Sequence, residues 1–147
     1  MVERTASSPG TETVPLRPGL FETDTAGTVR LVASRCQECG AHFFPGRLVC
    51  ARCRSDRMVT APLSSRGVLY TYTTVYQSTP EFQTPYILAY VDLPEGVRLL
   101  AQLVGAPPDE VRIGMSLELR VEPVRADAEG RPVLGYRFHP AGEVPRV

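Results

Sequence analysis

The sequence predicts a mostly β protein in which a small four-cysteine ribbon precedes a five-stranded barrel. All four cysteines of the 147-residue chain lie within "CQECGAHFFPGRLVCARC", residues 36–53. After residue 60, apolar and polar residues alternate with a period of two in several segments, which is the pattern of β-strands. A helical period does not persist for three turns at any point. An apolar content of 43% is sufficient for a packed core.

We divide the chain into four parts. Residues 1–18 are expected to form a flexible N-terminal segment, residues 19–60 a zinc ribbon with a short lead-in, residues 61–140 the barrel and residues 141–147 a C-terminal tail. In the lead-in, residues 20–34 are expected to form a short helical turn and then the first ribbon strand. We find neither a signal peptide nor a stretch that could span a bilayer. We therefore expect a cytoplasmic protein, whose thiols stay reduced.

The cysteines form two C-x-x-C pairs, and this spacing is typical of a zinc ribbon. We predict that Cys36, Cys39, Cys50 and Cys53 bind one structural Zn²⁺ per chain. Gly40 suits the tight backbone of a knuckle whose amides turn toward the thiolates. A closed shell of four thiolates has no open position for water, so the site is structural and not catalytic. The alternatives are two disulfides, which a reducing compartment disfavours, and a rubredoxin-like iron centre, which spacing alone does not distinguish from zinc.

The cysteine segment is the basic part of a neutral protein. The chain carries 16 basic residues, all of them arginine, and 16 acidic residues, whereas residues 30–57 carry six arginines against Glu38 and Asp56. Either these arginines offset the negative charge of the thiolates, or some of them bind a phosphate-bearing ligand, which the planar guanidinium suits well. His42 lies in the same loop and is expected to be a surface residue, because four cysteines already complete the metal shell.

The first three barrel strands are expected between residues 67 and 105. In "GVLYTYTTVY", residues 67–76, β-branched and aromatic residues dominate. Residues 85–105 resemble two strands joined by a turn at 94–96, "PEG". The following segment, residues 105–115, allows at most one turn of helix.

The last two strands are expected at residues 116–123 and 131–138. The first of them alternates cleanly and is expected to end at Pro123, with an inward face of Leu117, Leu119 and Val121. The second is expected to place three large side chains on one face, Leu134, Tyr136 and Phe138. Five strands in about 75 residues fit a small closed or partly open barrel such as the OB-fold.

Three tyrosines, Tyr70, Tyr72 and Tyr76, share one parity on the first barrel strand. On one strand face they could stack nucleic-acid bases, as OB-folds that bind single strands do. We favour the simpler interpretation that they fill the barrel or an interface.

The chain does not have the residue patterns that catalysis requires. All four cysteines are assigned to the metal, there are only two histidines, and neither a G-x-S-x-G motif nor a glycine-rich phosphate loop is present. We therefore expect that the protein is not an enzyme by itself.

Several motifs occur in an order that resembles the zinc-ribbon plus OB-fold family of acyl-CoA-associated proteins. They are C-x-x-C-G, Phe44-Pro45, Arg47, the second C-x-x-C, "RGVLYTYT", "YVDLPEGVRLLAQL" and "IGMSLELRV", and the resemblance covers roughly residues 20–140. Gly46, where many members have a second proline, and "ARC" in the second knuckle depart from the pattern without touching the predicted ligands.

The resemblance implies a rubredoxin-like zinc ribbon followed by a five-stranded OB-fold barrel. It also implies a non-catalytic accessory subunit, whose partner is a thiolase-fold enzyme or a related aldolase, acyltransferase or hydratase acting on CoA thioesters. In such a complex this chain would stabilise the partner and help to form the acyl-CoA channel. We name Arg47 and Arg54 as candidate contacts to CoA or to the partner.

Two other functions compete with this interpretation. Zinc ribbons and OB-folds both occur in proteins that bind single-stranded nucleic acid, but a pI near 6.7 argues against that function, because backbone binding needs a strong positive footprint. A purely architectural subunit that never contacts CoA is the other alternative.

Overall fold

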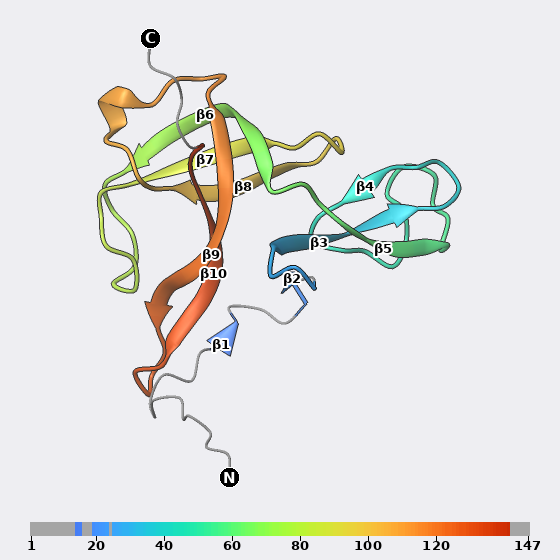
Figure 1. Cartoon of the computed structure of the whole chain (residues 1–147), viewed down its shortest axis with the longest axis horizontal. Coiled ribbons are helices and arrows are strands. Elements are labelled where there is room, and N and C mark those ends of the chain that lie inside the picture. Colours follow the sequence, from blue (N-terminus) through green and yellow to red (C-terminus); the bar gives the residue numbers. More distant parts are fainter. Residues whose placement is uncertain (1–13, 16–18, 24, 142–147) are drawn as a thin grey trace.

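The computed structural model of the protein describes residues 14–15, 19–23 and 25–141. The predicted flexible segment, apart from residues 14–15, and the predicted tail, apart from Ala141, lie outside the described residues. A ribbon and a barrel lie side by side and are joined by a short linker (Figure 1). This arrangement confirms the predicted fold class, mostly β with the ribbon preceding a closed five-stranded barrel. No helix among the described residues is long and apolar enough to cross a membrane.

The ribbon is built around β3 (Val29–Cys36). The short strand β2 (Phe21–Thr23) pairs antiparallel with the first half of β3, and β4 (His42–Phe43) and β5 (Met58–Pro62) pair with its second half. The helical turn expected in the lead-in is wrong, because residues 21–23 are extended. The turn at Gly27, which has a φ of +87°, folds this segment back onto β3 as a hairpin.

The five barrel strands close on themselves. They are β6 (Arg66–Val75), β7 (Tyr86–Asp92), β8 (Arg98–Leu103), β9 (Ser116–Ala126) and β10 (Pro132–Pro140). The order around the barrel is β6-β7-β8-β10-β9, and β9 pairs with β6 to complete the ring. Only the pairing of β8 with β10 is parallel within this ring. The predicted single helical turn is the 3-10 helix η1 (Pro108–Glu110).

The hairpin of β9 and β10 is longer than the sequence predicts. Pro123 does not end β9, which continues to Ala126, and the hairpin extends beyond the barrel (Figure 1). The register against β10 shifts between Val133 and Leu134, and such a bulge tolerates a proline within a strand. Val133 and Gly135 are buried while Leu134 is only partly buried, so the predicted face of β10 holds only for its second half. The strand β1 (Val14–Pro15) pairs with β10 at this bulge.

A β-bulge also separates the tyrosines of β6. The register against β7 shifts directly after Leu69, so that Tyr70 is an extra residue on the bulged strand. Tyr70 is 47% exposed, whereas Tyr72 lies opposite Ala89 and packs against the core. The prediction of one shared tyrosine face is therefore wrong, because a one-residue insertion reverses the direction of every following side chain.

The ribbon and the barrel share one hydrophobic core. Leu31 and Ala33 of β3, together with Leu63 of the linker, belong to the same buried cluster as Leu69 and Phe138 of the barrel. Leu31 and Leu63 are fully buried, and the Leu63 amide donates to the Leu31 carbonyl at 2.9 Å. The base of the ribbon is therefore a fixed part of the barrel's packing.

Gly67 is predicted to be required for the close packing of β6 against β7 within the barrel. A β-carbon at Gly67 would lie 2.6 Å from Val91 Cγ1 and 2.8 Å from the Asp92 carbonyl oxygen. We expect Gly67→Ala to lower the free energy of unfolding by about 1–3 kcal/mol, the usual cost of overpacking, as measured by urea denaturation. The neighbouring Val68→Ala, at a half-exposed position, should change it by no more than about 0.5 kcal/mol. Equal denaturation midpoints for the two variants would contradict this account.

Candidate functional site

Two knuckles of the ribbon bring the four predicted cysteine ligands together. All four sulfur atoms lie within 4.8 Å of one another. Cys36 Sγ is 3.6 Å from Cys53 Sγ, and Cys39 Sγ is 3.6 Å from Cys50 Sγ. Cys36 and Cys50 are buried, while Cys39 and Cys53 are exposed. Of the residues that the structure describes, these four form the one group of side chains placed to hold a metal ion.

The spacing of the sulfurs fits a metal and not disulfides. A tetrahedral shell with Zn–S bonds of about 2.3 Å places its sulfurs about 3.8 Å apart, close to the observed 3.6 Å. A disulfide bond requires about 2.05 Å between its sulfurs, and the four thiols are free. The ribbon therefore has a four-cysteine metal site. Its closed shell allows a structural role and has no position at which a substrate could bind the metal.

The two knuckles repeat one backbone geometry. The amide of Gly40 donates to the Cys36 carbonyl at 2.9 Å, and the amide of Arg54 donates to the Cys50 carbonyl at the same distance. Gly40 has a φ of +80°, and Arg54, at the equivalent position, has a φ of +69°. A left-handed conformation costs a residue with a side chain about 1–2 kcal/mol, so the second knuckle is more strained than the first.

Backbone amides stabilise the thiolate of Cys36 in the first knuckle. The amides of Glu38 and Cys39 donate to Cys36 Sγ at 3.3 and 3.5 Å. The pKa of Cys36 is lowered chiefly by the Cys39 amide, with a further contribution from Glu38, and together these outweigh the effect of burial.

The second knuckle acts on Cys50 in the same way. Burial raises the pKa of Cys50, but the amides of Cys53 and Arg52, both 3.3 Å from the sulfur, and the neighbouring thiols lower it to about 6. For Cys53 the Ser55 amide lowers the pKa, yet burial and the surrounding thiols prevail and raise it to about 12. Four thiols at this distance cannot all ionise next to one another, and a divalent cation removes that conflict.

Arg47 and Arg54 lie on either side of the second C-x-x-C pair. The Arg47 amide donates to Ser34 Oγ at 2.8 Å, and the Ser34 hydroxyl donates to the Arg47 carbonyl at 3.1 Å, so the backbone is fixed on β3. The Arg47 guanidinium lies 5.4 Å from the ring centre of Phe43. His42 is half-buried on β4 and is not among the clustered ligands.

Sequence reasoning missed two exposed aliphatic residues in the loop before the second knuckle. Leu48 is 86% exposed and Val49 is 51% exposed. The signal was present in "GRLVCARCR", residues 46–54, where two adjacent aliphatic residues stand among arginines within a metal-bound loop.

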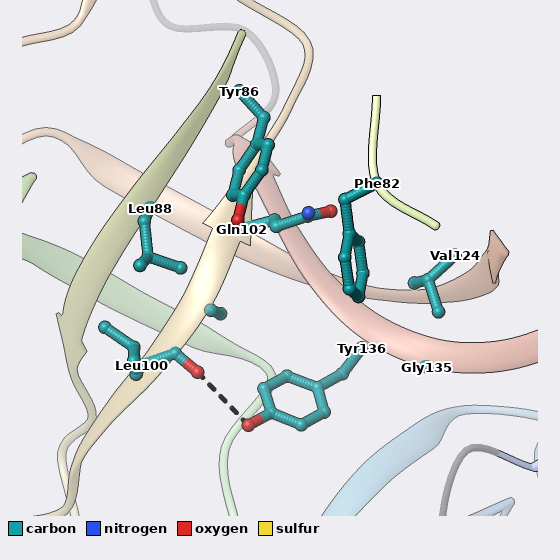
Figure 2. Close-up of a pocket in the computed structure, with 9 residues that line it drawn as sticks. Phe82, Tyr86, Leu88, Leu100, Gln102, Val124, Gly135 and Tyr136 are labelled. Atoms are coloured by element: carbon teal, nitrogen blue, oxygen red, sulfur yellow. Dashed lines mark hydrogen bonds between the residues drawn. The ribbon is translucent and has the colours of Figure 1, made fainter. Parts of the chain in front are cut away.

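An apolar groove of about 230 Å³ lies on the outer wall of the barrel and was also not predicted. Figure 2 shows Phe82 and Tyr86 at one end and Tyr136 at the other, with Leu88 and Leu100 along one side. The Tyr136 hydroxyl donates to the Leu100 carbonyl at 3.1 Å (Figure 2). Burial raises the pKa of Tyr136.

The ribbon reaches one rim of this groove. The ring of Phe44 meets the ring of Tyr136 edge-on, with 5.7 Å between their centres. A more polar hollow of about 510 Å³ shares Phe82 and Tyr86 with the groove and includes Arg137. The guanidinium of Arg137 donates to Gln102 Oε1 at 2.9 Å. The barrel thus offers an apolar surface that has polar groups at one end and the ribbon at the other.

Two family models match consecutive parts of the chain. A rubredoxin-like zinc ribbon domain of the ChsH2 type matches residues 26–59, and the C-terminal OB-fold domain of the same type matches residues 60–122. Together they cover well over half of the chain.

Similar proteins of comparable length are known. A "DUF35 domain-containing scaffold protein" of Methanocaldococcus jannaschii is 36% identical over 114 residues, which are 75% of this chain and 81% of that protein. The "Benzoylsuccinyl-CoA thiolase subunit BbsA" of Thauera aromatica is 37% identical over 122 residues, which are 82% of this chain and 84% of that subunit. A solved structure, "Ltp2-ChsH2(DUF35) aldolase", superposes with a TM-score of 0.64 at 34% identity and covers 76% of this chain and 84% of that chain.

The metal site is predicted to release its metal ion in acid. The pKa of the Cys50 thiol is lower in the folded protein than in the unfolded chain, so the thiolate stabilises the fold above the unfolded value, and this stabilisation is lost as pH falls through about 6. Bound metal extends the thiolate form to lower pH, so we expect one metal ion per chain at neutral pH and release below pH 6. Elemental analysis after dialysis across this pH range would measure the metal content at neutral pH and its loss in acid.

Cys39→Ser should leave the ribbon unfolded, while retention of full metal content by that variant would contradict the assignment.

Arg54 offers a test of backbone strain at the metal. We expect Arg54→Gly to stabilise the metal-loaded protein by about 1 kcal/mol, because glycine adopts the left-handed conformation without a steric penalty. Arg52→Gly, in the same knuckle but without a positive φ, is the matched control and should stabilise nothing. Thermal unfolding of both variants would compare them. A loss of stability in Arg54→Gly as large as in Arg52→Gly would show that the side chain matters more than the backbone.

Proposed function

We propose that the chain is a non-catalytic accessory subunit of an acyl-CoA-processing enzyme complex. It belongs to the ChsH2-type family, which has a rubredoxin-like zinc ribbon and a C-terminal OB-fold domain. The observation that carries the proposal is the similarity over most of the chain to a thiolase subunit, to a scaffold protein and to a protein in an aldolase structure. The catalytic partner is then a thiolase-fold enzyme, or a related aldolase, acyltransferase or hydratase.

The chemistry of the ribbon is consistent with an accessory role. Its four sulfurs occupy every position around a tetrahedral ion, so the metal holds the ribbon together and does not activate a substrate. We propose zinc over iron, because the family model that matches this segment is a zinc ribbon. Free thiols are also consistent with the cytoplasmic location that we propose.

The outer wall of the barrel is the surface that we propose to contribute to the acyl-CoA channel. The groove between Phe82 and Tyr136 is lined mainly by apolar side chains, which suit an acyl group. Phe44 places the ribbon at the rim of this groove, and Arg47 follows three residues later in the chain. Arg47 and Arg54 therefore remain our candidates for contacts to a CoA phosphate or to the partner.

The geometry gives less support to binding of single-stranded nucleic acid. Base stacking would need exposed tyrosines on one face, but Tyr72 packs against the core. The ring of Tyr70 is covered by the Arg98 guanidinium, which lies 3.4 Å from the ring centre. Arg98 in turn pairs with Asp92 at 2.6 Å, so the cation beside this ring is already neutralised.

The accessory role predicts a stable complex with a catalytic partner, identified among the enzymes encoded beside this chain. The chain alone should show no thiolase, aldolase, hydratase or acyltransferase activity, and the coexpressed pair should copurify through an interface above about 1,000 Å². Arg47→Ala should raise the KM for the CoA thioester or weaken the complex, while the metal stays bound. Arg112→Ala, at an exposed arginine of the barrel, is the control and should change neither. A partner equally soluble and active without this chain would refute the proposal.

A further inference from the structure

We infer that the ribbon tip, residues 47–54, is the anchor by which the chain docks into an apolar pocket with an acidic rim on its catalytic partner. This inference rests on the proposed function and adds to it a particular contact surface and the chemistry of the surface that receives it. The knuckles lie at the end of the ribbon that points away from the barrel (Figure 1). Every residue of the tip except Cys50 is exposed, so the tip is accessible to another protein without any rearrangement of the barrel.

The first observation is the exposure of the aliphatic pair at the tip. Leu48, at 86%, is the most exposed of the large apolar residues in the described part of the chain, and Val49 beside it is 51% exposed. Single exposed apolar residues are common, but two adjacent ones form a small contiguous patch, and exposed apolar patches mark interaction surfaces. Burial of such a pair in a partner's pocket would remove its apolar surface from water, and the arginines beside it are of a type that contributes strongly to interface affinity.

The second observation is that this pair is held rigidly. On one side, two hydrogen bonds between Ser34 and Arg47 fix the backbone directly before Leu48. On the other side, Val49 precedes Cys50, which is buried in the metal site and whose amide donates to the Ser55 carbonyl at 2.8 Å. A loop that is fixed before binding loses little conformational entropy when it docks, and such preorganisation favours affinity.

The third observation is the charge around the pair. Three arginines, Arg47, Arg52 and Arg54, lie within the tip, and the sequence from Gly40 to Ser55 contains no acidic residue. The nearest acid before it, Glu38, is paired with Arg57 at 2.6 Å. Over residues 30–57, six arginines against Glu38 and Asp56 give a charge of +4, which exceeds the double negative charge of a divalent metal with four thiolates. The complementary surface is therefore apolar at its centre and acidic at its rim, where charges steer and orient a complex.

A protein pocket fits this tip better than a lipid surface. A single myristoyl chain gives only marginal membrane binding, and the two side chains of Leu48 and Val49 together contain fewer carbons than that chain. The ring of Phe43, which could have extended the apolar surface, lies beneath the Arg47 guanidinium. The small apolar area of Leu48 and Val49 therefore suits a single pocket on a protein better than a membrane.

Site-specific photo-crosslinking of the full chain in its native host tests the inference. Benzoylphenylalanine would replace Leu48 in one variant and Ile113, a 65% exposed residue of the barrel, in the control. We expect the Leu48 probe to yield one covalent adduct with an acyl-CoA enzyme, joined at a peptide beside Asp or Glu side chains, and the Ile113 probe to yield none. An adduct from Ile113 alone, or an adduct of the Leu48 probe with lipid or nucleic acid, would overturn the docking role of the tip.

The reconstituted complex provides the second measurement. Leu48→Ser combined with Val49→Ser should weaken binding of the identified partner at least about tenfold, whereas Ile113→Ser should not, and the metal content of both variants should stay unchanged. Arg52→Glu should slow association, and added salt should weaken the unaltered complex. If the pair binds with unchanged affinity after the Leu48 and Val49 substitutions, the tip is not the anchor although the accessory function stands. If no acyl-CoA enzyme binds the unaltered chain, the proposed function itself fails.

Discussion

The confinement of four thiols within 4.8 Å of one another is the constraint on which the ribbon depends. Without a cation, one of the thiols, Cys53, keeps its proton to a pKa of about 12 because its neighbours compete for negative charge. A divalent metal removes this competition, because all four thiolates bind the cation instead of repelling one another. In a segment whose strands are short, this binding is the main interaction that holds the ribbon together. The binding free energy of such a metal is folding free energy, so the loops between the knuckles owe their shape to it.

The metal alone would not determine where the ribbon lies relative to the barrel. That orientation follows from Leu31 and Leu63, which are fully buried in the barrel's own core, and from Ser64, whose amide and hydroxyl donate to Glu95 at 3.0 and 2.8 Å. The edge-on contact of Phe44 with Tyr136 adds a second point of attachment. With one end packed into the barrel and the other closed by metal, the ribbon presents its tip in a defined direction.

Much of the fold and of the metal site could be predicted because local sequence patterns determine both. Cysteine spacing specifies a knuckle directly, and a period of two specifies a strand. The failures occur where the chain departs from a strict period: the bulge after Leu69 exchanges the outward and inward faces of the β6 residues beyond it, and the register shift between Val133 and Leu134 leaves Val124 of β9 without a partner. These shifts depend on the partner strand, which a single sequence does not show. The exposed fraction of a side chain also depends on residues that are distant in the sequence. Leu48 could therefore be placed in the loop but not recognised as exposed.

The barrel groove and the ribbon tip differ in their distribution of charge. The barrel groove is lined mainly by apolar side chains, and its polar end is already satisfied, since the Arg137 guanidinium donates to Gln102 and contacts Glu122 at 3.4 Å. Such a surface can contact an apolar group without binding a charged group tightly. The ribbon tip combines apolar side chains with arginines, and guanidinium groups add orientation to a docked surface. A protein that is neutral overall can therefore have a charged, selective surface at one end and an apolar, permissive surface along its wall, and this division fits the accessory role that we propose.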